Sequence, residues 1–485
     1  MNIQAWRYKR FHVSYLLGWF SFGLLAGLFM GRNSSGSLDS AMLIMTALIL
    51  TLGALRSRRW WAVVVIVAAG MLLGLLRGST VQEGYAAYDS LLNHHVTLQG
   101  KMTGDAQRGA GNRQQITITD VKSERVQYPG EAFVILYSDA QLKRGDIISI
   151  EGAAREGFAS YGAVLSGAKL VKLERGEDMI RDIRERFTGA LRAVVIEPMA
   201  SLGLGFVVGQ RSTLPDTLDE QLKVVGLTHI VVASGYNLTI LVRFMMRLLS
   251  KHSRYLALIG SLLMITSFVL FSGFSPSMNR AVIVTTLGLL AWYVGRRFHP
   301  VLLIAYVASM TAFVNPMYVW SDLGWYLSFF AFAGILVVAP LVVGLLYKRR
   351  QPVAIEQLVI ETMSAEMMAL PLVAFAFGTL PVFALVANIL VAPLIPAAML
   401  FTAISGTIAM ISTSVAAVAA LPTTLLIGYM VAVVEWLAGL PHAQYDIEFD
   451  VVMIGLWYGA MAVACVIIQH KTSYSFRRRD HRLEV

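Results

Sequence analysis

One apolar stretch of the chain carries polar side chains whose spacing could line a path through a membrane. It reads Gly226-Leu-Thr-His229-Ile-Val-Val-Ala-Ser234-Gly235-Tyr236-Asn237-Leu-Thr. Polar groups inside an apolar span are costly unless they face a partner or water. In a continuous helix, His229, Tyr236 and Arg243 would share one face, because they recur every seven residues; the Ser234-Gly235 pair could also unwind it. The run therefore predicts either a water-facing path or close packing between helices.

Ionisable side chains also fall inside or beside apolar segments. Arg280 lies one turn into such a segment, where it could reach the membrane surface, pair with an acid or bind an anionic substrate. Asp322, at the edge of a later segment, is the partner that we expect, and a structural ion pair is the simpler outcome. Glu366 falls near the middle of another segment. A structural hydrogen bond is the simpler expectation for it, and a proton relay is the alternative.

The sequence carries no motif for enzyme chemistry. A hydrolase pair of His229 and Ser234 would need an orienting acid, and none lies nearby. The phosphate-binding pattern Gly-x-x-x-x-Gly-Lys-Ser/Thr is absent, so we expect no nucleotide hydrolysis by that route. The one cysteine, Cys465, excludes an internal disulfide and argues against a thiolate metal site. We therefore expect no enzyme, no metal and no cofactor.

The composition shows which elements must position these residues. Of 485 residues, 56% are hydrophobic and 14% charged, whereas soluble domains carry about 25% charged residues. A purely soluble protein and a disordered one are both excluded. The apolar stretches are continuous rather than alternating, which argues against a transmembrane barrel. The fold class that we expect is a polytopic α-helical membrane protein with a small all-β insert outside the cytoplasm.

The apolar runs predict about twelve crossings, with both termini in the cytoplasm. Half of the 40 basic residues form clusters that fall on one side of this layout, as the positive-inside rule requires. The net charge of +10 thus reflects topology more than DNA binding. Two crossings and a half-helix broken near Pro393 and Pro396 account for 381–440. The other crossings are expected at 14–31, 41–55, 60–76, 226–249, 255–272, 277–295, 301–315, 323–345, 356–377 and 451–469.

Short alternating runs in the insert predict a barrel of five strands. We expect these strands at 96–102, 114–120, 131–137, 146–153 and 168–173. Small barrels of this kind often adopt the OB fold, which can bind single-stranded nucleic acid. Phe133 and Tyr137 could stack on bases, although side chains spaced four apart in a strand more often fill a core. The insert is nearly balanced in charge, so it shows no electrostatic footprint for DNA.

These patterns divide the chain into five regions. They are N-terminal transmembrane helices at 1–77, the OB-like domain at 78–186, an interfacial helical segment at 187–225, a polytopic channel domain at 226–470 and a basic cytoplasmic tail at 471–485.

Four motifs in this order resemble the ComEC-type competence channel family of bacteria. The stretch from Gly226 to Gly235 is similar to the most recognisable stretch of that family. Pro276-Ser277 with Arg280-Ala281 resembles its arginine motif. Asp322-Leu-Gly324-Trp-Tyr-Leu327-Ser328-Phe329 resembles its aspartate–glycine–serine span, and Ala387-Asn388-Ile-Leu-Val-Ala-Pro393 resembles its late Asn/Pro motif. The resemblance covers the whole chain, because the order of spans, insert and channel block also agrees.

The resemblance implies a cell-membrane channel component for DNA uptake in natural transformation, which moves single-stranded DNA across the bacterial cytoplasmic membrane. Its path candidates are His229, Ser234, Tyr236, Asn237, Arg280, Asp322, Ser328, Asn388 and Pro393. Expected partners are single-stranded DNA and membrane lipid, with a separate DNA receptor, nuclease and cytoplasmic translocation ATPase, and homo-oligomers are an open expectation. The alternative is a transporter of another solute or lipid, or a channel homologue that has diverged in function.

Two departures from the family pattern, and one difference from its longer members, qualify this interpretation. Tyr236-Asn237 stands where the family typically has Leu-His, and Trp325-Tyr326 stands where it typically has Phe-Gln. Both changes alter polar groups in segments expected to be functional. Longer members of the family end in a metallo-β-lactamase-like domain, whereas this sequence reaches Val485 without its His-x-His-x-Asp-His motif. We therefore expect a short form without a nuclease of its own.

Overall fold

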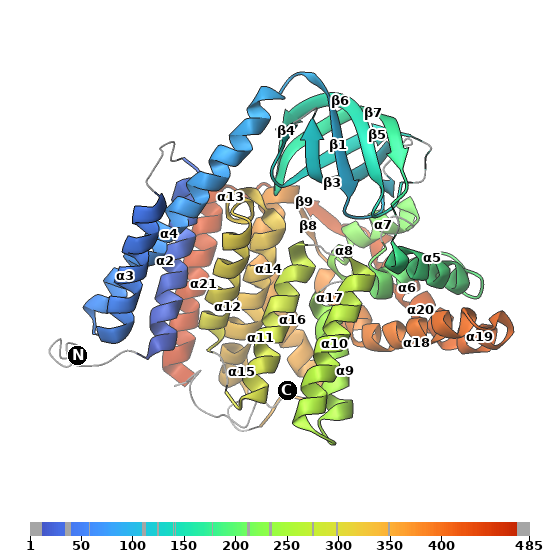
Figure 1. Ribbon diagram of the computed structural model, residues 1–485. Helices are drawn as coiled ribbons and strands as arrows, with labels where there is room; N and C mark the ends of the chain where they lie inside the picture. The colour runs from blue at the N-terminus through green and yellow to red at the C-terminus, as the bar shows by residue number, and fades with distance from the viewer. Residues whose placement is uncertain are drawn as a thin grey trace. The chain divides into compact units, whose positions relative to one another are not determined.

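The computed structural model describes residues 12–33, 40–57, 59–108, 113–123, 126–138, 140, 142–176, 178–210, 214–231, 235–273, 276–296, 299–347 and 350–472. The chain divides into two compact units, each with a hydrophobic core of its own (Figure 1). Unit 1 comprises Met1–Gly176 and Phe298–Phe329, and unit 2 comprises Glu177–Arg297 and Phe330–Val485.

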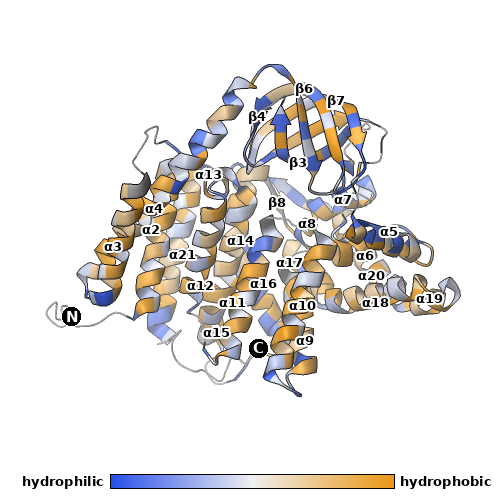
Figure 2. Cartoon of the chain, in the orientation of Figure 1, coloured by the Kyte–Doolittle hydropathy of each residue, from blue (hydrophilic) through white to orange (hydrophobic). Residues whose placement is uncertain are grey.

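The protein is mostly helical and carries the apolar helices of a membrane protein. Among the described residues, eight helices are long and apolar enough to cross a membrane. Figure 2 shows that hydrophobic residues dominate these helices, whereas hydrophobic and hydrophilic residues alternate on the barrel strands. Three further apolar helices are shorter, at Met42–Ser57, Met199–Val208 and Pro300–Val314. The expected number of about twelve crossings therefore stays a prediction.

Unit 1 begins with three helices and adds more from a later part of the chain. Their bounds are α2 (Val13–Gly31), α3 (Ser40–Ser57), α4 (Trp61–Ala86) followed by the 3-10 turn η1 (Ala87–Ser90), then α12 (Pro300–Val314), α13 (Met317–Ser321) and the first part of α14 (Leu323–Ala333). Helix α12 joins α2 through a hydrogen bond between the hydroxyls of Ser309 and Ser21 at 3.0 Å. The Trp320 indole of α13 donates to the Leu28 carbonyl at 2.8 Å.

Helices α2 and α4 pack along a seam of glycines, which we call the glycine seam. Its members recur every fourth residue on each helix: Gly23, Gly27 and Gly31 on α2, and Gly70, Gly74 and Gly78 on α4. A Cβ at Gly27 would lie 2.1 Å from the Met71 carbonyl oxygen, and one at Gly74 would lie 2.2 Å from that of Leu24. The two backbones therefore touch directly, as small residues at four-residue spacing allow.

Helix α4 continues ten residues beyond the expected end of its span at Leu76. The apolar run in the sequence ends there, and Arg77 follows it. In the structure, the Arg77 guanidinium donates to the carbonyls of Phe313 and Val314, at 3.0 and 3.1 Å. These are the last carbonyls of α12, which have no acceptor role within their own helix. Arg77 thus caps α12 while α4 runs on to meet the barrel.

The insert is a closed barrel of five long strands with the OB topology. The strands are β1 (His95–Met102), β3 (Arg113–Ser123), β5 (Glu131–Tyr137), β6 (Ile147–Glu156) and β7 (Tyr161–Glu174), with two-residue strands β2 (Gln107–Arg108) and β4 (Val126–Gln127) at β3. Strand β1 pairs with both β6 and β3 and so closes the barrel. Strands β5 and β7 pair in parallel, and the other long pairs are antiparallel.

The barrel core follows the alternation seen in the sequence. In β5, Ala132, Val134 and Leu136 are fully buried, whereas their neighbours point outward. The same inward face on the other strands supplies Leu98, Ile118, Ile148 and Leu165. The barrel rests on the end of α4, where Tyr88 donates from its hydroxyl to the Pro129 carbonyl at 3.0 Å. The expected OB-like barrel is confirmed.

Unit 2 contains most of the remaining helices. They are α5 (Met179–Arg192), α6 (Met199–Val208), α7 (Asp216–Val224), α8 (Thr228–Val231), α9 (Gly235–Leu249), α10 (Arg254–Ser272), α11 (Pro276–Tyr293), the π-helical η2 (Gly334–Val338), α15 (Ala339–Leu346), α16 (Ala354–Phe377), α17 (Ala384–Val391), the 3-10 turn η3 (Ala392–Leu394), α18 (Ile395–Ala409), α19 (Thr413–Ala419), α20 (Leu421–Ala438) and α21 (Val451–Thr472). Strands β8 (Thr379–Pro381) and β9 (Gln444–Asp446) form a small antiparallel pair.

Three features of unit 2 bear on the predicted layout. The break expected near Pro393 is present as the single turn η3 between α17 and α18. Helices α18 and α20 run crosswise to α9 and α10 (Figure 1). Helix α6 belongs to the segment expected at a membrane interface, and it is buried along nearly its whole length in unit 2. The interfacial position of 187–225 stays a prediction.

The glycine seam predicts a sharp difference between two glycine substitutions. Gly74→Val should lower the stability of the purified protein in detergent by about 1–3 kcal/mol, because the valine overpacks a backbone contact. Gly53→Val on α3 is the matched control, since a Cβ there meets no atom within 4 Å. Thermal unfolding of both variants measures the effect. Equal melting temperatures for the two variants would contradict the seam.

Candidate functional site: the polar core of unit 2

The segment before α8 places His229 beside a tight backbone contact. Gly226 has a φ of +74°, a conformation that favours glycine. A Cβ at this position would lie 2.9 Å from the Cβ of Ala384 on α17. The His229 ring donates to the Gly226 backbone, and the side chain is exposed.

The start of α9 brings the same motif against α11. A Cβ at Gly235 would lie 2.7 Å from the Cβ of Ala281. Asn237 is fully buried, and its Nδ2 donates to the Phe206 carbonyl of α6 at 3.3 Å. Its Oδ1 has no partner among the described residues. Asn237, which departs from the family pattern, therefore ties α9 to α6.

Two other candidates in this motif are only partly described. Ser234 lies outside the described residues. Tyr236 belongs to α9, but its side chain lies outside what the structure describes. Helices α8 and α9 flank residues 232–234, so the choice between a continuous and an unwound helix stays open. The path roles of both residues stay predictions.

Arg280 lies on α11 beside the contact with α9. It is 2% exposed, and its neighbours Met278 and Ala281 belong to the buried core of unit 2. A cation in such a place needs acceptors or an anion nearby. Asp322, its expected partner, belongs to unit 1, so the ion pair between them stays a prediction.

Asp322 performs a local task at the start of α14. Its Oδ1 accepts from the Trp325 backbone N–H at 3.0 Å, which is the bond of a helix N-cap. The Trp325 indole donates to the Thr311 hydroxyl of α12 at 3.0 Å, and the Tyr326 hydroxyl donates to the Val319 carbonyl. The unusual Trp325-Tyr326 pair therefore fastens α14 to α12 and α13. Ser328 is half-buried on the same helix.

Asn388 links α17 to an acidic side chain in the middle of α16. It is 5% exposed, and its Nδ2 donates to Glu366 Oε1 at 2.8 Å. The expected structural hydrogen bond of Glu366 is thus present. Pro393 is exposed in the turn η3, where it helps to end α17 because proline has no N–H to donate.

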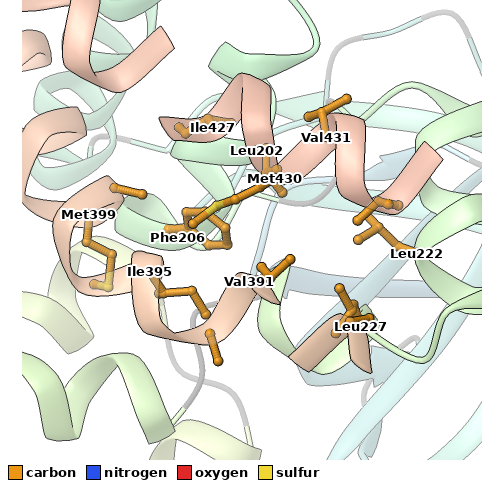
Figure 3. Close-up of a cluster of buried hydrophobic side chains, with 14 of the residues drawn as sticks. Leu202, Phe206, Leu222, Leu227, Val391, Ile395, Met399, Ile427, Met430 and Val431 are labelled. Carbon is orange, nitrogen blue, oxygen red and sulfur yellow. The ribbon is translucent and has the colours of Figure 1, made fainter. Parts of the chain in front are cut away.

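Three of the four sequence motifs converge on one hydrophobic core in unit 2. The core contains Leu227 and Leu238 from the first motif, Ala281 from the second, and Ala387 and Val391 from the fourth. Figure 3 shows Leu227 and Val391 together with side chains from α6, α18 and α20. This core holds the backbone positions of His229, Asn237, Arg280 and Asn388. We call these four residues, which lie far apart in sequence but beside members of one hydrophobic core, the polar core.

The barrel carries a second candidate surface in unit 1. Phe133 and Tyr137 point outward from β5, away from the barrel interior. The Phe133 ring meets Phe158 and Tyr161, with centroids 5.3 Å apart in each pair. Phe158 lies in the loop between β6 and β7 and is 51% exposed. These three rings form what we call the aromatic cluster.

The cation Arg113 of β3 lies beside Tyr137 at the other end of the β3–β5 pair. Tyr137 is exposed, and its hydroxyl accepts from Arg113 Nε at 2.7 Å. The Arg113 guanidinium also lies 5.6 Å from the centre of the Tyr137 ring. Burial raises the pKa of Tyr161, so its hydroxyl stays neutral at physiological pH. The face thus combines π-surfaces with one positive charge.

Some of these residues gave no signal in the sequence. Phe158 and Tyr161 lie in or beside a loop, so no strand pattern pointed to them, and only closure of the barrel brings them to Phe133.

Among the described residues, no three His, Cys, Asp or Glu side chains come together to hold a metal ion.

A comparison with known protein families matches the part of the chain that contains the polar core. A family model described as Competence protein matches residues 206–471, which is more than half of the chain. The chain is also similar to an uncharacterized protein of Aquifex aeolicus (strain VF5), with 26% identity over 217 residues. That match covers 43% of this chain and 49% of the relative, so it spans about half the length of that protein. No solved structure matches the chain.

The tight contact at Gly226 leads to a stability prediction. Gly226→Ala should destabilise the protein by roughly 1–3 kcal/mol, because alanine is strained at this φ and meets Ala384. Gly428→Ala on α20 is the control, since a Cβ there meets no atom within 4 Å and alanine favours helix. Thermal unfolding of the two purified variants compares them. A Gly226→Ala variant as stable as the wild type would contradict this packing of α8 on α17.

Proposed function

Because this chain belongs to the Competence protein family, we propose that it conducts single-stranded DNA across the bacterial cytoplasmic membrane during natural transformation. Membership of the family connects this membrane protein with DNA uptake in competence. The observation that supports the conduction of single-stranded DNA is that the family match and the polar core fall in the same part of the chain. The family match, residues 206–471, includes the whole polar core of unit 2 with His229, Arg280 and Asn388.

The polar core has chemistry suited to a nucleic acid strand. A passing strand presents phosphate anions and bases with many donors and acceptors. Arg280 supplies a cation, and Asn388 supplies an amide inside an apolar unit. The exposed side chain of His229 supplies a further polar group. In this proposal these side chains replace water along the path of the strand.

The barrel supplies a separate contact for the same ligand. In OB folds, the face of the second and third strands and the adjoining loops binds oligonucleotides. Here those strands are β3 and β5, and the loop between β6 and β7 carries Phe158. The aromatic cluster and the Arg113–Tyr137 pair lie on this face. We propose that unpaired bases stack on Phe133, Phe158 and Tyr137 before the strand enters the membrane.

The proposal places the barrel outside the cytoplasm and both termini inside, as the distribution of basic residues favours. Nuclease and ATPase activities are assigned to separate proteins, because the sequence carries no motif for either. A separate DNA receptor would deliver the strand.

The barrel contact predicts a loss of affinity for single-stranded DNA. Stacking of a base on an aromatic ring contributes about 1–3 kcal/mol, so Phe158→Ala should weaken binding about 5- to 150-fold. Fluorescence anisotropy of a labelled oligonucleotide with the full-length protein in detergent measures it. Val171→Ala on β7 is the control, because Val171 is 60% exposed and lies outside the aromatic cluster. Equal affinities of the two variants would contradict the stacking role.

The transport proposal predicts the behaviour of a deletion strain. A strain without this protein should take no labelled DNA into the cytoplasm, and the wild-type gene should restore uptake. Arg280→Gln should restore it only weakly at equal abundance in the membrane, because the path loses its buried cation. Normal uptake by the deletion strain would favour a transporter of another solute or lipid instead.

A further inference from the structure

Glu366 is an acid in the middle of a membrane-length helix. It lies at the centre of Ile355–Phe377, one of the eight helices long and apolar enough to cross a membrane. Within the described part of the chain, its partner is Asn388, whose amide donates to Oε1 at 2.8 Å, and no cation pairs with it. An amide N–H is a partner for a neutral acid as well as for a carboxylate. A carboxylate without a cation is costly in this setting, so the acid is stabilised by binding a proton.

The backbone near Glu366 is irregular both in α16 itself and in the helical segment that packs against it. Pro371 lies inside α16 and has no N–H to donate to the carbonyl of Met367. The Trp457 indole of α21 donates to that carbonyl instead, at 3.0 Å, and the Tyr458 hydroxyl donates to the next one, of Met368, at 2.8 Å. Directly after Glu366, the carbonyl of Met367 thus depends on another helix for its hydrogen bond.

The facing helix has a second irregularity at the same depth. The π-helical turn η2 packs on α16, and a Cβ at Gly334 would lie 2.3 Å from the Ser364 carbonyl. Ser364 is two residues before Glu366. Single π-turns occur frequently at functional sites, and proline kinks allow a helix to bend. The acid therefore lies between two places where the helices can change shape.

A short series of contacts connects Glu366 with the motif around His229. Asn388 and Ala384 are one turn apart on the same face of α17. Ala384 closely approaches Gly226, whose backbone accepts from the His229 ring. A change in the bond between Glu366 and Asn388 would thus reach His229 through a single short helix.

We propose that Glu366 is a reversible proton-binding site that controls the position of α17 and thereby the backbone contact at Gly226 beside His229. With a proton bound, the neutral acid accepts from Asn388 and holds α17 against α16. When the proton returns to water, the carboxylate recruits water, and α17 and the Gly226 contact shift. The step moves one proton between water and the carboxyl oxygen and changes no other bond. Its role in DNA passage rests on the proposed function.

Few other titratable groups face this site. Helix α17, strand β8 and the run from η2 to α15 carry none. Helix α21 brings Tyr458, Cys465, His470 and Lys471, of which Tyr458 bonds to α16 directly. On α16 itself, Glu356 pairs with Arg350 at 2.8 Å and Glu361 accepts from Gln357. Glu361 is therefore the matched control for Glu366.

The first experiment detects the proton directly and requires no DNA. Infrared difference spectra of the full-length protein in lipid vesicles, recorded across a pH titration, should contain a carboxylic acid band. Glu366→Gln should remove this band, because the amide keeps the shape and the acceptor for Asn388 but binds no proton. Glu361→Gln should keep it. The proposed site is refuted if the wild-type protein shows no such titrating band, a result that does not depend on the folding of any variant. It is also refuted if Glu366→Gln retains the band.

The second experiment tests the coupling to transport. DNA uptake by cells or vesicles containing the wild-type protein should change several-fold with pH, and Glu366→Gln should make uptake independent of pH. A Glu366→Gln variant with the wild-type pH profile would overturn the coupling even if the infrared band is lost. If wild type moves no DNA while the band still titrates at Glu366, the proposed function fails and the proton site stands.

Discussion

A polar group inside an apolar helical unit must find its partner within the protein, and this constraint governs unit 2. Asn237 bonds to the Phe206 carbonyl, and Asn388 bonds to Glu366. The carbonyl that Pro371 leaves without an N–H receives the Trp457 indole. Each such bond joins two helices, so the polar residues fix which helices are neighbours. The hydrophobic core then fills the space between these bonds.

Unit 1 also depends on contacts between its helices, but these contacts are mainly between backbones. Its glycine seam lets α2 and α4 approach until their backbones touch, which replaces side-chain packing by direct dispersion contact. Arg77 can then lie in an apolar helix because it caps the end of α12. The continuation of α4 carries this rigid pair to the barrel, where Tyr88 bonds to Pro129. The barrel thus stands on a firm support that presents its aromatic cluster.

The sequence predicted the local elements far better than the contacts between them. Alternation set strand β5 at its observed bounds, and apolar runs located α10, α16 and α21 within a few residues. The continuation of α4 beyond Leu76 has no signal in the apolar pattern, because Arg77 finds its acceptors on a helix more than 200 residues away. The glycine seam was visible as a four-residue repeat, but its partner helix was not.

In the candidate site, too, the sequence indicated individual residues better than the contacts between them. Motif order pointed to Asn388, but only the fold pairs it with Glu366. Their spacing in the predicted strand left Phe133 and Tyr137 as either core or stacking residues, and in the structure both point outward. Asp322 was singled out as a charge partner, and the structure adds a helix cap that its spacing did not indicate. Bonds between distant elements depend on the whole fold, and no spacing along the chain encodes them.

The central claim is that DNA passes the exposed side chain of His229 in unit 2, and cross-linking to a strand in transit tests it most directly. A photoreactive amino acid at position 228 keeps the His229 ring, and one at position 263 on α10 replaces Leu263, which is 63% exposed. A strand arrested during uptake should cross-link at position 228 and not at 263. Equal labelling at both positions, or labelling at 263 alone, would contradict the account.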